Sequence, residues 1–280
     1  MELGRLEKSN FGKIEDHEKN YLGILADLDG TVNRGDLLID GVHEVYSRLS
    51  ARGVHWLFLS NNAQKSADDL AEKLSRLGLP VTSEQVVNSA SVVINSLEKD
   101  YVGARAMVIG EPSLIQGIKG AGSVIESDPS KTDIVVIGMD TGLTYEKIKL
   151  AYLAITRGAL FWATNLDPIF PVPGGFHPGA GSVVAPLITA LGRQPDRVFG
   201  KPETDMADLA LERLHLSKES CLVVGDRMDT DILFAKKAKI DSALVLTGAT
   251  TRGNLEGYNY SPNYVLETIA EIERLFDNNE

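Results

Sequence analysis

Short apolar runs alternate along the chain with longer segments in which apolar residues recur at helical spacing. Runs of this length between turn residues are typical of buried strands, whereas a repeat of about 3.6 residues indicates a helix. The pattern predicts strands over residues 21–26, 54–59, 86–87, 106–109, 133–137, 159–163, 221–224 and 242–246. It predicts helices over residues 41–52, 66–77, 89–99, 145–156, 182–191 and 204–214, with a terminal strand and helix over 264–276.

This alternation of strands and helices predicts the fold class. Parallel strands joined by right-handed helical crossovers form a doubly wound α/β sheet. One stretch interrupts the alternation, because residues 167–181 have the sequence DPIFPVPGGFHPGAG and are dense in proline and glycine. We expect this stretch to be an irregular, functional loop, since neither residue favours regular structure.

Polar clusters follow three of the predicted strands. Their sequences are DLDGT from Asp27, SNN from Ser60 and GDRMDTD from Gly225. Sites in doubly wound sheets gather at the carboxyl ends of strands, so we expect the three clusters to converge. Extended residues two positions apart point to the same side, so Asp27 and Asp29 can both face one substrate.

The residue types in these clusters suit phosphoryl chemistry. Two clusters supply carboxylates, which repel one another and are costly to bury unless a cation neutralises them. Ligation by oxygen alone favours Mg²⁺, and Lys201 adds a positive charge between a glycine and a proline. One carboxylate can attack phosphorus while a second serves as general acid and then base, with Mg²⁺ and the lysine neutralising the phosphoryl oxygens.

Composition narrows the class of partner. Hydrophobic residues make up 43% of the chain and charged residues 24%, as in ordinary globular proteins. The net charge of −11 argues against a protein that binds nucleic acids or anionic membranes nonspecifically. Cys221 is the only cysteine and cannot form an intramolecular disulfide, and the sequence shows no signal-peptide core or bilayer-length apolar run. We therefore expect a cytoplasmic protein that acts on a small molecule, with no nucleic-acid or membrane partner.

The polar clusters, in this order, resemble the motifs of the haloacid dehalogenase (HAD) superfamily of phosphohydrolases. Residues 27–31 look like its first motif, Ser60 matches the second, Lys201 the third and residues 225–231 the fourth. The segments RGDLLIDG, LSNN, ATNLD, PGAGS and VFGKP are similar to the NagD/para-nitrophenylphosphatase type, which has a class IIA cap. The resemblance spans residues 22–250 and implies a Rossmann-like core with an inserted α/β cap domain.

The resemblance also implies a role for each matching acidic residue. Asp27 would be the nucleophile that forms an aspartyl phosphate, and also a ligand of Mg²⁺. Asp29 would protonate the leaving alkoxide and then activate water, while its backbone carbonyl ligates the metal. Asp226 would be the third protein ligand, and Asp231 would lie behind it and orient a metal-bound water or Lys201.

The remaining motif residues would bind the phosphoryl group, as the resemblance implies. Ser60 and the backbone amide of Asn61 would hold its oxygens, with Asn62 beside them. Lys201 would pair with Asp27 and with the phosphate. All of these positions match the family pattern, which predicts an active enzyme.

The polar N-terminal residues are expected to form a peripheral arm, and the resemblance predicts that the rest of the chain divides into two core segments and a cap. These are residues 1–20 for the arm, 21–100 and 197–280 for the core, and 101–196 for the cap. A cap that closes over the site excludes water and favours small metabolites. In the cap, Thr164, Asn165 and Asp167 are candidates for substrate contact, although Asn165 and Asp167 suit a structural role in the loop equally well. His177 is a weaker candidate.

The function predicted from the sequence is Mg²⁺-dependent hydrolysis of a small phosphorylated metabolite, with a sugar or glycerol-type phosphate preferred on family grounds. A nucleoside monophosphate, phosphoglycolate or pyridoxal phosphate is an alternative substrate. A second enzymatic hypothesis is phosphoryl transfer to the hydroxyl group of an acceptor molecule instead of to water. A non-catalytic phosphometabolite-binding protein on the same scaffold is a remote one. The resemblance also suggests a homodimer.

Overall fold

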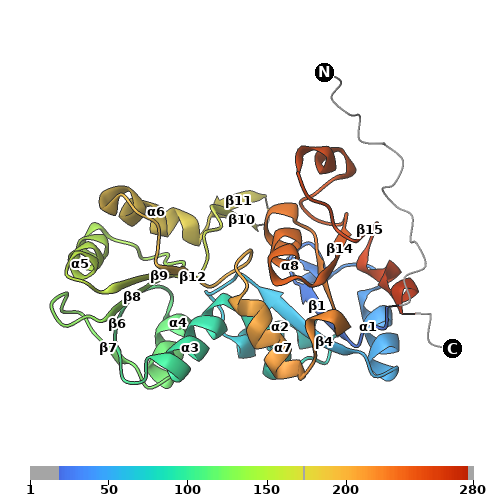
Figure 1. The fold of residues 1–280 in the computed structure, drawn as a ribbon, viewed down its shortest axis with the longest axis horizontal. Helices are drawn as coiled ribbons and strands as arrows, with labels where there is room; N and C mark the ends of the chain where they lie inside the picture. Colours follow the sequence, from blue (N-terminus) through green and yellow to red (C-terminus); the bar gives the residue numbers. More distant parts are fainter. Residues whose placement is uncertain (1–18, 173, 277–280) are drawn as a thin grey trace. The chain divides into compact units, whose positions relative to one another are not determined.

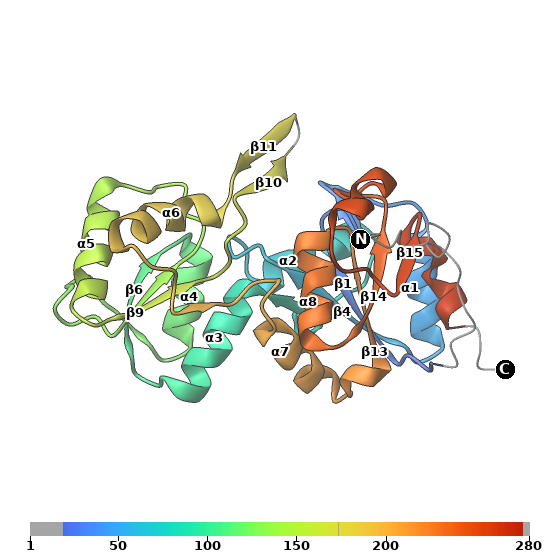
Figure 2. The same ribbon diagram turned by 45° about the horizontal axis from the view of Figure 1, so that its top comes forward.

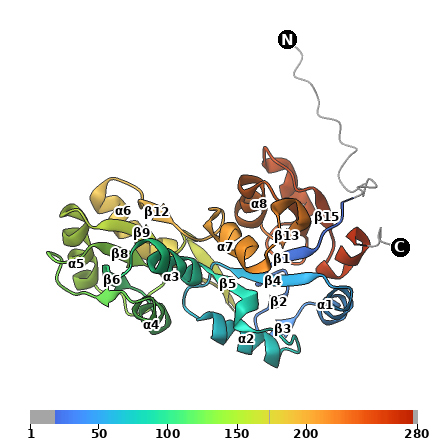
Figure 3. The same ribbon diagram turned by 60° about the horizontal axis from the view of Figure 1, so that its bottom comes forward.

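The computed structural model describes residues 19–172 and 174–276, so most of the predicted N-terminal arm lies outside the described residues. A first sheet, shown in Figures 1 and 3, has the strand order β15 (Tyr264–Leu266), β14 (Asp241–Val245), β13 (Cys221–Gly225), β1 (Gly23–Asp27), β4 (His55–Ser60) and β5 (Val86–Asn88). A second sheet has the order β12 (Arg197–Val198), β9 (Leu160–Ala163), β8 (Ile134–Ile137), β6 (Arg105–Ile109) and β7 (Val124–Ile125). A short ribbon is formed by β2 (Asn33–Arg34) and β3 (Leu37–Leu38).

Helices alternate with these strands along the chain, as the sequence pattern predicts. They are α1 (Val42–Ala51), α2 (Ala67–Arg76), α3 (Ser89–Asp100), α4 (Pro112–Gly120), α5 (Tyr145–Thr156), α6 (Ala180–Leu191), α7 (Asp205–Leu214) and α8 (Leu233–Ala238). Each predicted strand and helix is present with ends shifted by no more than two residues, although the terminal helix is a 3₁₀ helix, Ile269–Leu275. The doubly wound α/β fold is therefore confirmed.

Helix α4 was not predicted, and its composition explains why. Gly117 and Gly120 lower its helix propensity. The helix is stabilised by tertiary packing, because Leu114 and Ile118 on one face are almost fully buried. A Cβ at Gly117 would overlap the Ile94 side chain of α3, so glycine permits this close approach.

The described part of the chain forms two compact units, and the boundary between them falls inside β4. The first unit extends to Arg34 and also contains Leu38–Trp56 and the chain from Leu216 onward. The second unit contains Gly35–Leu37 and Leu57–His215. The second sheet lies wholly within the second unit, while the domain limits expected from the sequence stay a prediction.

The core of the first unit is built around β1 and β13. These strands pair in parallel, with Ala26 opposite Val224. Ile24 and Leu222 are fully buried, as are their neighbours along both strands. Continuous burial is expected for parallel strands that are covered on both faces, which explains why both sequences are apolar without alternation.

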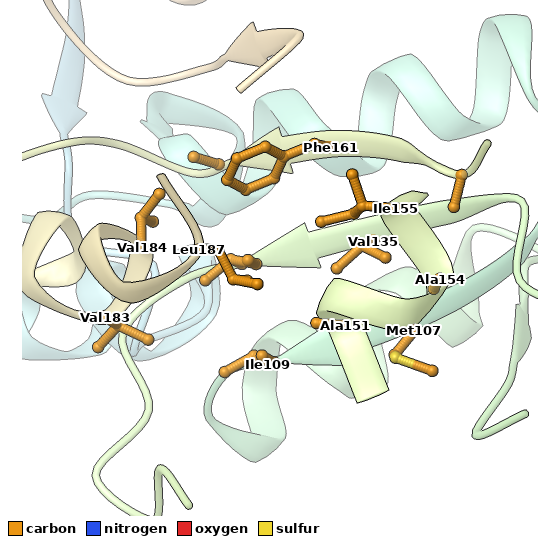
Figure 4. Close-up of a cluster of buried hydrophobic side chains, with 13 residues drawn as sticks. Met107, Ile109, Val135, Ala151, Ala154, Ile155, Phe161, Val183, Val184 and Leu187 are labelled. Atoms are coloured by element: carbon orange, nitrogen blue, oxygen red, sulfur yellow. The ribbon is translucent and has the colours of Figure 1, made fainter. Parts of the chain in front are cut away.

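The second sheet packs against α5 and α6 through an apolar core (Figure 4). Val135, Phe161 and Leu187 are fully buried there. Burial of a side chain of this size stabilises the fold by about 1.5–3 kcal/mol.

Among the described residues, no helix has the length and apolar character needed to cross a membrane.

The prediction of an irregular loop over residues 167–181 is wrong. Strands β10 (Ile169–Val172) and β11 (Gly175–Pro178) form an antiparallel hairpin, which extends away from the second sheet in Figure 2. In a two-stranded ribbon many backbone N–H groups face solvent, so Pro171 and Pro178 are tolerated. Gly174, with φ +88°, provides the conformation that the tight turn needs.

The base of the hairpin is closed by the glycines of the PGAGS segment. The N–H of Gly179 donates to the carbonyl of Pro168 at 2.8 Å, and that of Gly181 donates to the carbonyl of Asp167 at 2.9 Å. A Cβ at either glycine would overlap one of the facing carbonyl oxygens of residues 166 and 167. These hydrogen bonds make the stretch regular, because they hold its two ends together.

Candidate active site

The ends of β1 and β13 bring two acidic residues together in the first unit. Asp27 is the last residue of β1, and Asp226 directly follows β13. The two strands are neighbours and parallel, so their carboxyl ends lie at the same edge of the sheet. The convergence of these two polar clusters therefore follows from strand pairing.

Asp231 completes an acidic group with these two residues. One carboxylate oxygen from each of Asp27, Asp226 and Asp231 lies within 4.8 Å of the others. Asp226 and Asp231 are 3% and 1% exposed, whereas Asp27 is only partly buried. Three carboxylates at this spacing repel one another in a buried environment, and a cation removes the repulsion. The donor set consists of oxygen atoms alone, so it fits a hard divalent cation.

Asp226 lies in a narrow slot between two backbone segments. The N–H of Ala249 donates to Asp226 Oδ2 at 2.6 Å, and the N–H of Thr250 donates to its carbonyl at 3.1 Å. A Cβ at Gly30 or at Gly248 would overlap the same carboxylate oxygen. Both glycines are therefore required for the position of Asp226.

Gly248 is a site residue that the sequence analysis missed. It lies three residues beyond Val245, the last residue of β14, which pairs in parallel with β13. The available signal was the strand predicted over residues 242–246, because the loop after it belongs at the same edge as Asp226.

Asp231 is placed by a π-helix, Met228–Ile232. Its Oδ2 accepts a hydrogen bond from the N–H of Arg227 at 3.0 Å. A Cβ at Gly225 would overlap the side chain of Asp231, so the glycine lets this residue pack against the end of β13. Asp229 points elsewhere: it is exposed and forms a two-point ion pair with Arg227.

Asp29 has a different environment from the acidic group. It is exposed, and its Oδ1 accepts a hydrogen bond from Asn33 Nδ2 at 3.0 Å. A further backbone hydrogen bond, from Gly30 N–H to the Asn33 carbonyl at 2.8 Å, closes the same turn. The carboxyl group of Asp29 is thus oriented by its own turn and remains accessible to solvent.

In the second unit, the SNN sequence follows β4. Ser60 ends the strand and is 5% exposed, and its Oγ accepts a hydrogen bond from the N–H of Asn62 at 3.1 Å. Asn62 Oδ1 accepts one from the N–H of Gln64 at 2.9 Å. The cap of the next helix is Ser66, so the alternative that SNN serves as that cap is wrong.

Asn61 connects three further candidates within the second unit. Its side chain hydrogen-bonds to Asp167 and to both backbone polar groups of Lys201. Asn165 Nδ2 donates to the carbonyl of Asn61 at 2.7 Å, and Asn165 Oδ1 accepts from the N–H of Asp167 at 3.1 Å. Lys201 and Asn165 are each 4% exposed. The structure thus brings together Asn61, Asn165, Asp167 and Lys201.

The weaker candidate His177 and the single cysteine lie outside these groups. His177 is on the exposed strand β11, where its ring packs edge-on against Phe170 at 5.9 Å between centroids. Cys221 begins β13 and is fully buried, and burial raises the pKa of its thiol to about 11. The thiol is therefore protonated near neutral pH, as expected for a core side chain.

Comparison with known proteins identifies the family. The sequence-family model of haloacid dehalogenase-like hydrolases matches residues 24–124 of the chain. A second family model, of HAD-hydrolase-like proteins, matches residues 198–272. An acid sugar phosphatase of Staphylococcus saprophyticus is 35% identical over 255 residues, which cover 91% of this chain and 97% of the relative.

Solved structures give the same answer. A 4-nitrophenylphosphatase of Thermotoga maritima has a TM-score of 0.86 and 33% identity, covering 91% of this chain and 97% of that one. A glycerol phosphate phosphatase of Mycobacterium tuberculosis, solved with magnesium, has a TM-score of 0.82 and 36% identity, covering 89% of this chain and 75% of that one.

Parallel sheets flanked by helices, with carboxylates gathered where adjacent strands end, are typical of phosphohydrolases with a Rossmann-like fold. The chain belongs to the haloacid dehalogenase-like hydrolases, among the class IIA phosphatases of NagD/para-nitrophenylphosphatase type. The resemblance predicted from the motifs is confirmed.

Proposed function

We propose that the protein is a Mg²⁺-dependent phosphatase that hydrolyses a small sugar phosphate or glycerol-type phosphate through an aspartyl phosphate on Asp27. The main support is the acidic group of Asp27, Asp226 and Asp231. Within this group Asp27 is the least buried, so it is the carboxylate that a substrate can reach. Its position at the end of a buried strand suits a nucleophile, because the strand fixes its backbone.

The proposed reaction has two steps. In the first, Asp27 attacks phosphorus and the ester P–O bond breaks, while protonated Asp29 gives its proton to the leaving alkoxide. In the second, Asp29 takes a proton from water, the water oxygen bonds to phosphorus, and the bond between phosphorus and Asp27 breaks. The exposure of Asp29 and its hydrogen bond from Asn33 support this role, since they orient the carboxyl group without burying it.

We assign the phosphoryl-binding groups on the pattern of the family. Ser60, the backbone of Asn61 and Asn62, and the ammonium group of Lys201 would hold the phosphoryl oxygens. Lys201 would in addition pair with Asp27, and its charge offsets the charge that develops on the transferred group. The substrate contacts first expected for Asn165 and Asp167 are weaker proposals, because both side chains make hydrogen bonds within the protein.

The residues present fit a magnesium ion. Asp27, Asp226 and the backbone carbonyl of Asp29 would hold it, with Asp231 beside them. A bound Mg²⁺ neutralises phosphoryl oxygens and so lowers the barrier to attack by a carboxylate. The glycerol phosphate phosphatase of M. tuberculosis with magnesium supports the choice of metal.

The preference for sugar or glycerol phosphates rests on the names of the relatives. One is an acid sugar phosphatase and another a glycerol phosphate phosphatase. Nucleoside monophosphates, phosphoglycolate and pyridoxal phosphate have the same reacting group and belong in the same assay. We also propose that the protein is cytoplasmic and forms a homodimer. The cytoplasmic location is supported by the single cysteine, because one cysteine cannot form a disulfide within the chain.

Phosphate release from a panel of phosphomonoesters tests the proposal. The native protein and the Asp27→Asn variant are assayed with Mg²⁺ and with EDTA. The variant keeps the shape of the side chain and removes the nucleophile, so we expect Mg²⁺-dependent release by the native protein and none by the variant. No release from any ester, or equal release by the variant, would contradict the proposed mechanism and favour a binding protein.

Product analysis with added sugars separates hydrolysis from phosphoryl transfer. In hydrolysis, the amount of inorganic phosphate formed equals the amount of alcohol released, whatever acceptor is present. In transfer, a new phosphate ester of the added sugar appears and inorganic phosphate falls by the same amount. We expect the first result.

A further inference from the structure

The side-chain amide of Asn61 is fully engaged by two partners. Its Oδ1 accepts a hydrogen bond from the N–H of Lys201 at 2.7 Å, and its Nδ2 donates to the Lys201 carbonyl at 2.9 Å. The second Nδ2 proton goes to Asp167 Oδ2 at 2.7 Å. A primary amide has two protons to donate, and both are used here.

This arrangement allows the amide only one orientation. A carboxylate such as Asp167 is an acceptor, so it requires the NH₂ end of Asn61. With the amide rotated by half a turn, its oxygen would face both the Asp167 carboxylate and the Lys201 carbonyl, and its NH₂ would face the Lys201 N–H. Three hydrogen bonds would become three repulsive contacts. Asp167 and the two backbone groups of Lys201 therefore require the same orientation of the Asn61 amide, and Asp167 reinforces it.

The backbone of Lys201 is also confined from the side of the preceding residue. A Cβ at Gly200 would lie 2.7 Å from Asn61 Oδ1 and 2.6 Å from Asn165 Cβ, so the chain passes close to both residues. Asn61 itself is held through its main chain, because its carbonyl accepts hydrogen bonds from Asn165 Nδ2 at 2.7 Å and Ser89 Oγ at 2.8 Å. These contacts thus fix the backbone position from which the Lys201 side chain extends.

We propose that Asn61 and Asp167 are positioning residues, which hold the backbone of Lys201 where its ammonium group binds the phosphoryl group. This inference rests on the proposed function of Lys201. It differs from a role of the Asn61 and Asp167 side chains in recognising the leaving group. A displaced lysine weakens a contact that every phosphomonoester makes, so the loss of activity is the same for every ester. A displacement of about 1 Å in a catalytic group can cost about 100-fold in rate.

The Asn61→Asp variant tests the inference. It keeps the acceptor for the Lys201 N–H but places a carboxylate against Asp167 and the Lys201 carbonyl. We expect kcat to fall about 100-fold, by the same factor for 4-nitrophenyl phosphate, glycerol 3-phosphate and a sugar phosphate. The inhibition constant of inorganic phosphate rises in parallel, because phosphate has no leaving group.

Asn263→Asp is the matched control. Asn263 Nδ2 donates to Asp241 Oδ1 at 3.1 Å, and its Oδ1 accepts from the N–H of Ser242 at 2.9 Å. The substitution therefore places a new carboxylate beside that of Asp241, as Asn61→Asp does beside Asp167. The control pair lies where β14 and β15 begin. We expect its kcat to stay within about twofold of the native value, as for a substitution that touches no reacting group.

The double variant Asn61→Asp with Asp167→Asn exchanges the amide and the carboxylate. The new amide at position 167 can donate to the new carboxylate at position 61, which removes the repulsion between them. We expect the double variant to be more active than Asn61→Asp alone, by about tenfold, although it carries one more substitution. The Lys201 carbonyl still lacks its donor, so recovery is partial.

The outcomes distinguish this inference from the proposed function. If the native protein releases no phosphate, the proposed function fails. If the native enzyme is active and the losses differ between esters, or the double variant loses the product of the two single losses, the positioning role is wrong. Should Asn61→Asp not fold, Asp167→Ala decides alone, because it removes the acceptor of the second Asn61 Nδ2 proton. Equal losses across the esters support the inference, and unequal losses or no loss overturn it.

Discussion

The Cα of Gly248 faces Asp226 Oδ2 so closely that a Cβ at this position would overlap the carboxylate. Gly30 confines the same oxygen from another segment, and the N–H of Ala249 donates to it at 2.6 Å. The position of a proposed metal ligand thus depends on two residues without side chains. Neither glycine bears a reactive group, yet both belong to the site.

We expect Gly248→Ala to impair metal binding. The new methyl group displaces Asp226, so Mg²⁺ affinity and activity fall by about 10–100-fold, the range typical of damage to residues that support metal ligands. The Mg²⁺ concentration that gives half-maximal phosphate release is the measurement. Gly257→Ala is the control, because a Cβ there meets nothing within 4 Å. An unchanged Mg²⁺ requirement in Gly248→Ala would show that the overlap is relieved without moving Asp226.

Asp231 and Asp229 lie two residues apart and provide a second contrast. Asp231 is buried with Asp27 and Asp226, whereas Asp229 is exposed and paired with Arg227. Asp231→Asn removes one charge from the acidic group, so we expect Mg²⁺ affinity to fall by about tenfold. Asp229→Asn should change it by less than about twofold, since surface ion pairs contribute little. Calorimetric titration with Mg²⁺ compares the two, and equal effects would contradict the assignment of Asp231.

The hairpin β10–β11 gives a prediction on stability. A Cβ at Gly181 would overlap the carbonyl oxygen of Leu166 at the base of the hairpin. We expect Gly181→Ala to destabilise the protein by about 1–3 kcal/mol, as overpacking does. Gly120→Ala, at the end of α4, meets nothing within 4 Å and should be neutral. Urea unfolding of the two variants measures the difference, and equal midpoints would argue against close packing at the hairpin base.

The buried thiol of Cys221 predicts a loss of stability at alkaline pH. Burial raises its pKa from 9.0 to about 11, so the unfolded chain ionises first. Above pH ~9 the folded state binds more protons than the unfolded state, and stability therefore falls as pH rises towards the folded pKa. We expect native protein to lose about 1–2 kcal/mol more than Cys221→Ala between pH ~8 and ~11. Urea unfolding across this range is the measurement, and parallel losses would contradict the prediction.

The elements of the fold were largely predictable, because strands such as β1 and β13 are continuous apolar runs and helices such as α2 have a clear period. Helix α4 and the hairpin β10–β11 were missed because glycine and proline in their sequences argue against regular structure. Helix α4 contains two glycines and is stabilised by packing of Leu114 and Ile118. The hairpin β10–β11 is mostly exposed, and backbone hydrogen bonds to residues 167 and 168 stabilise it.

The reactive residues were also predictable, because chemistry restricts their types and the motifs fix their order. Asp27 and Asp226 follow buried strands, and parallel pairing brings them together. Gly248 and the contacts of Asn61 were not predictable in this way. Each depends on the approach of segments that are distant in the sequence, and a glycine or an asparagine alone does not indicate what it approaches.

The sequence by itself determined the α/β fold class, the family and the acidic residues that suit phosphoryl chemistry. These follow from local apolar runs and short motifs, which need no knowledge of distant neighbours. Only the tertiary structure decided that Asp231 joins Asp27 and Asp226, that Gly248 confines Asp226, and that the Asn61 amide binds the backbone of Lys201. Such contacts depend on distances of a few ångströms between separate segments, and packing alone sets those distances.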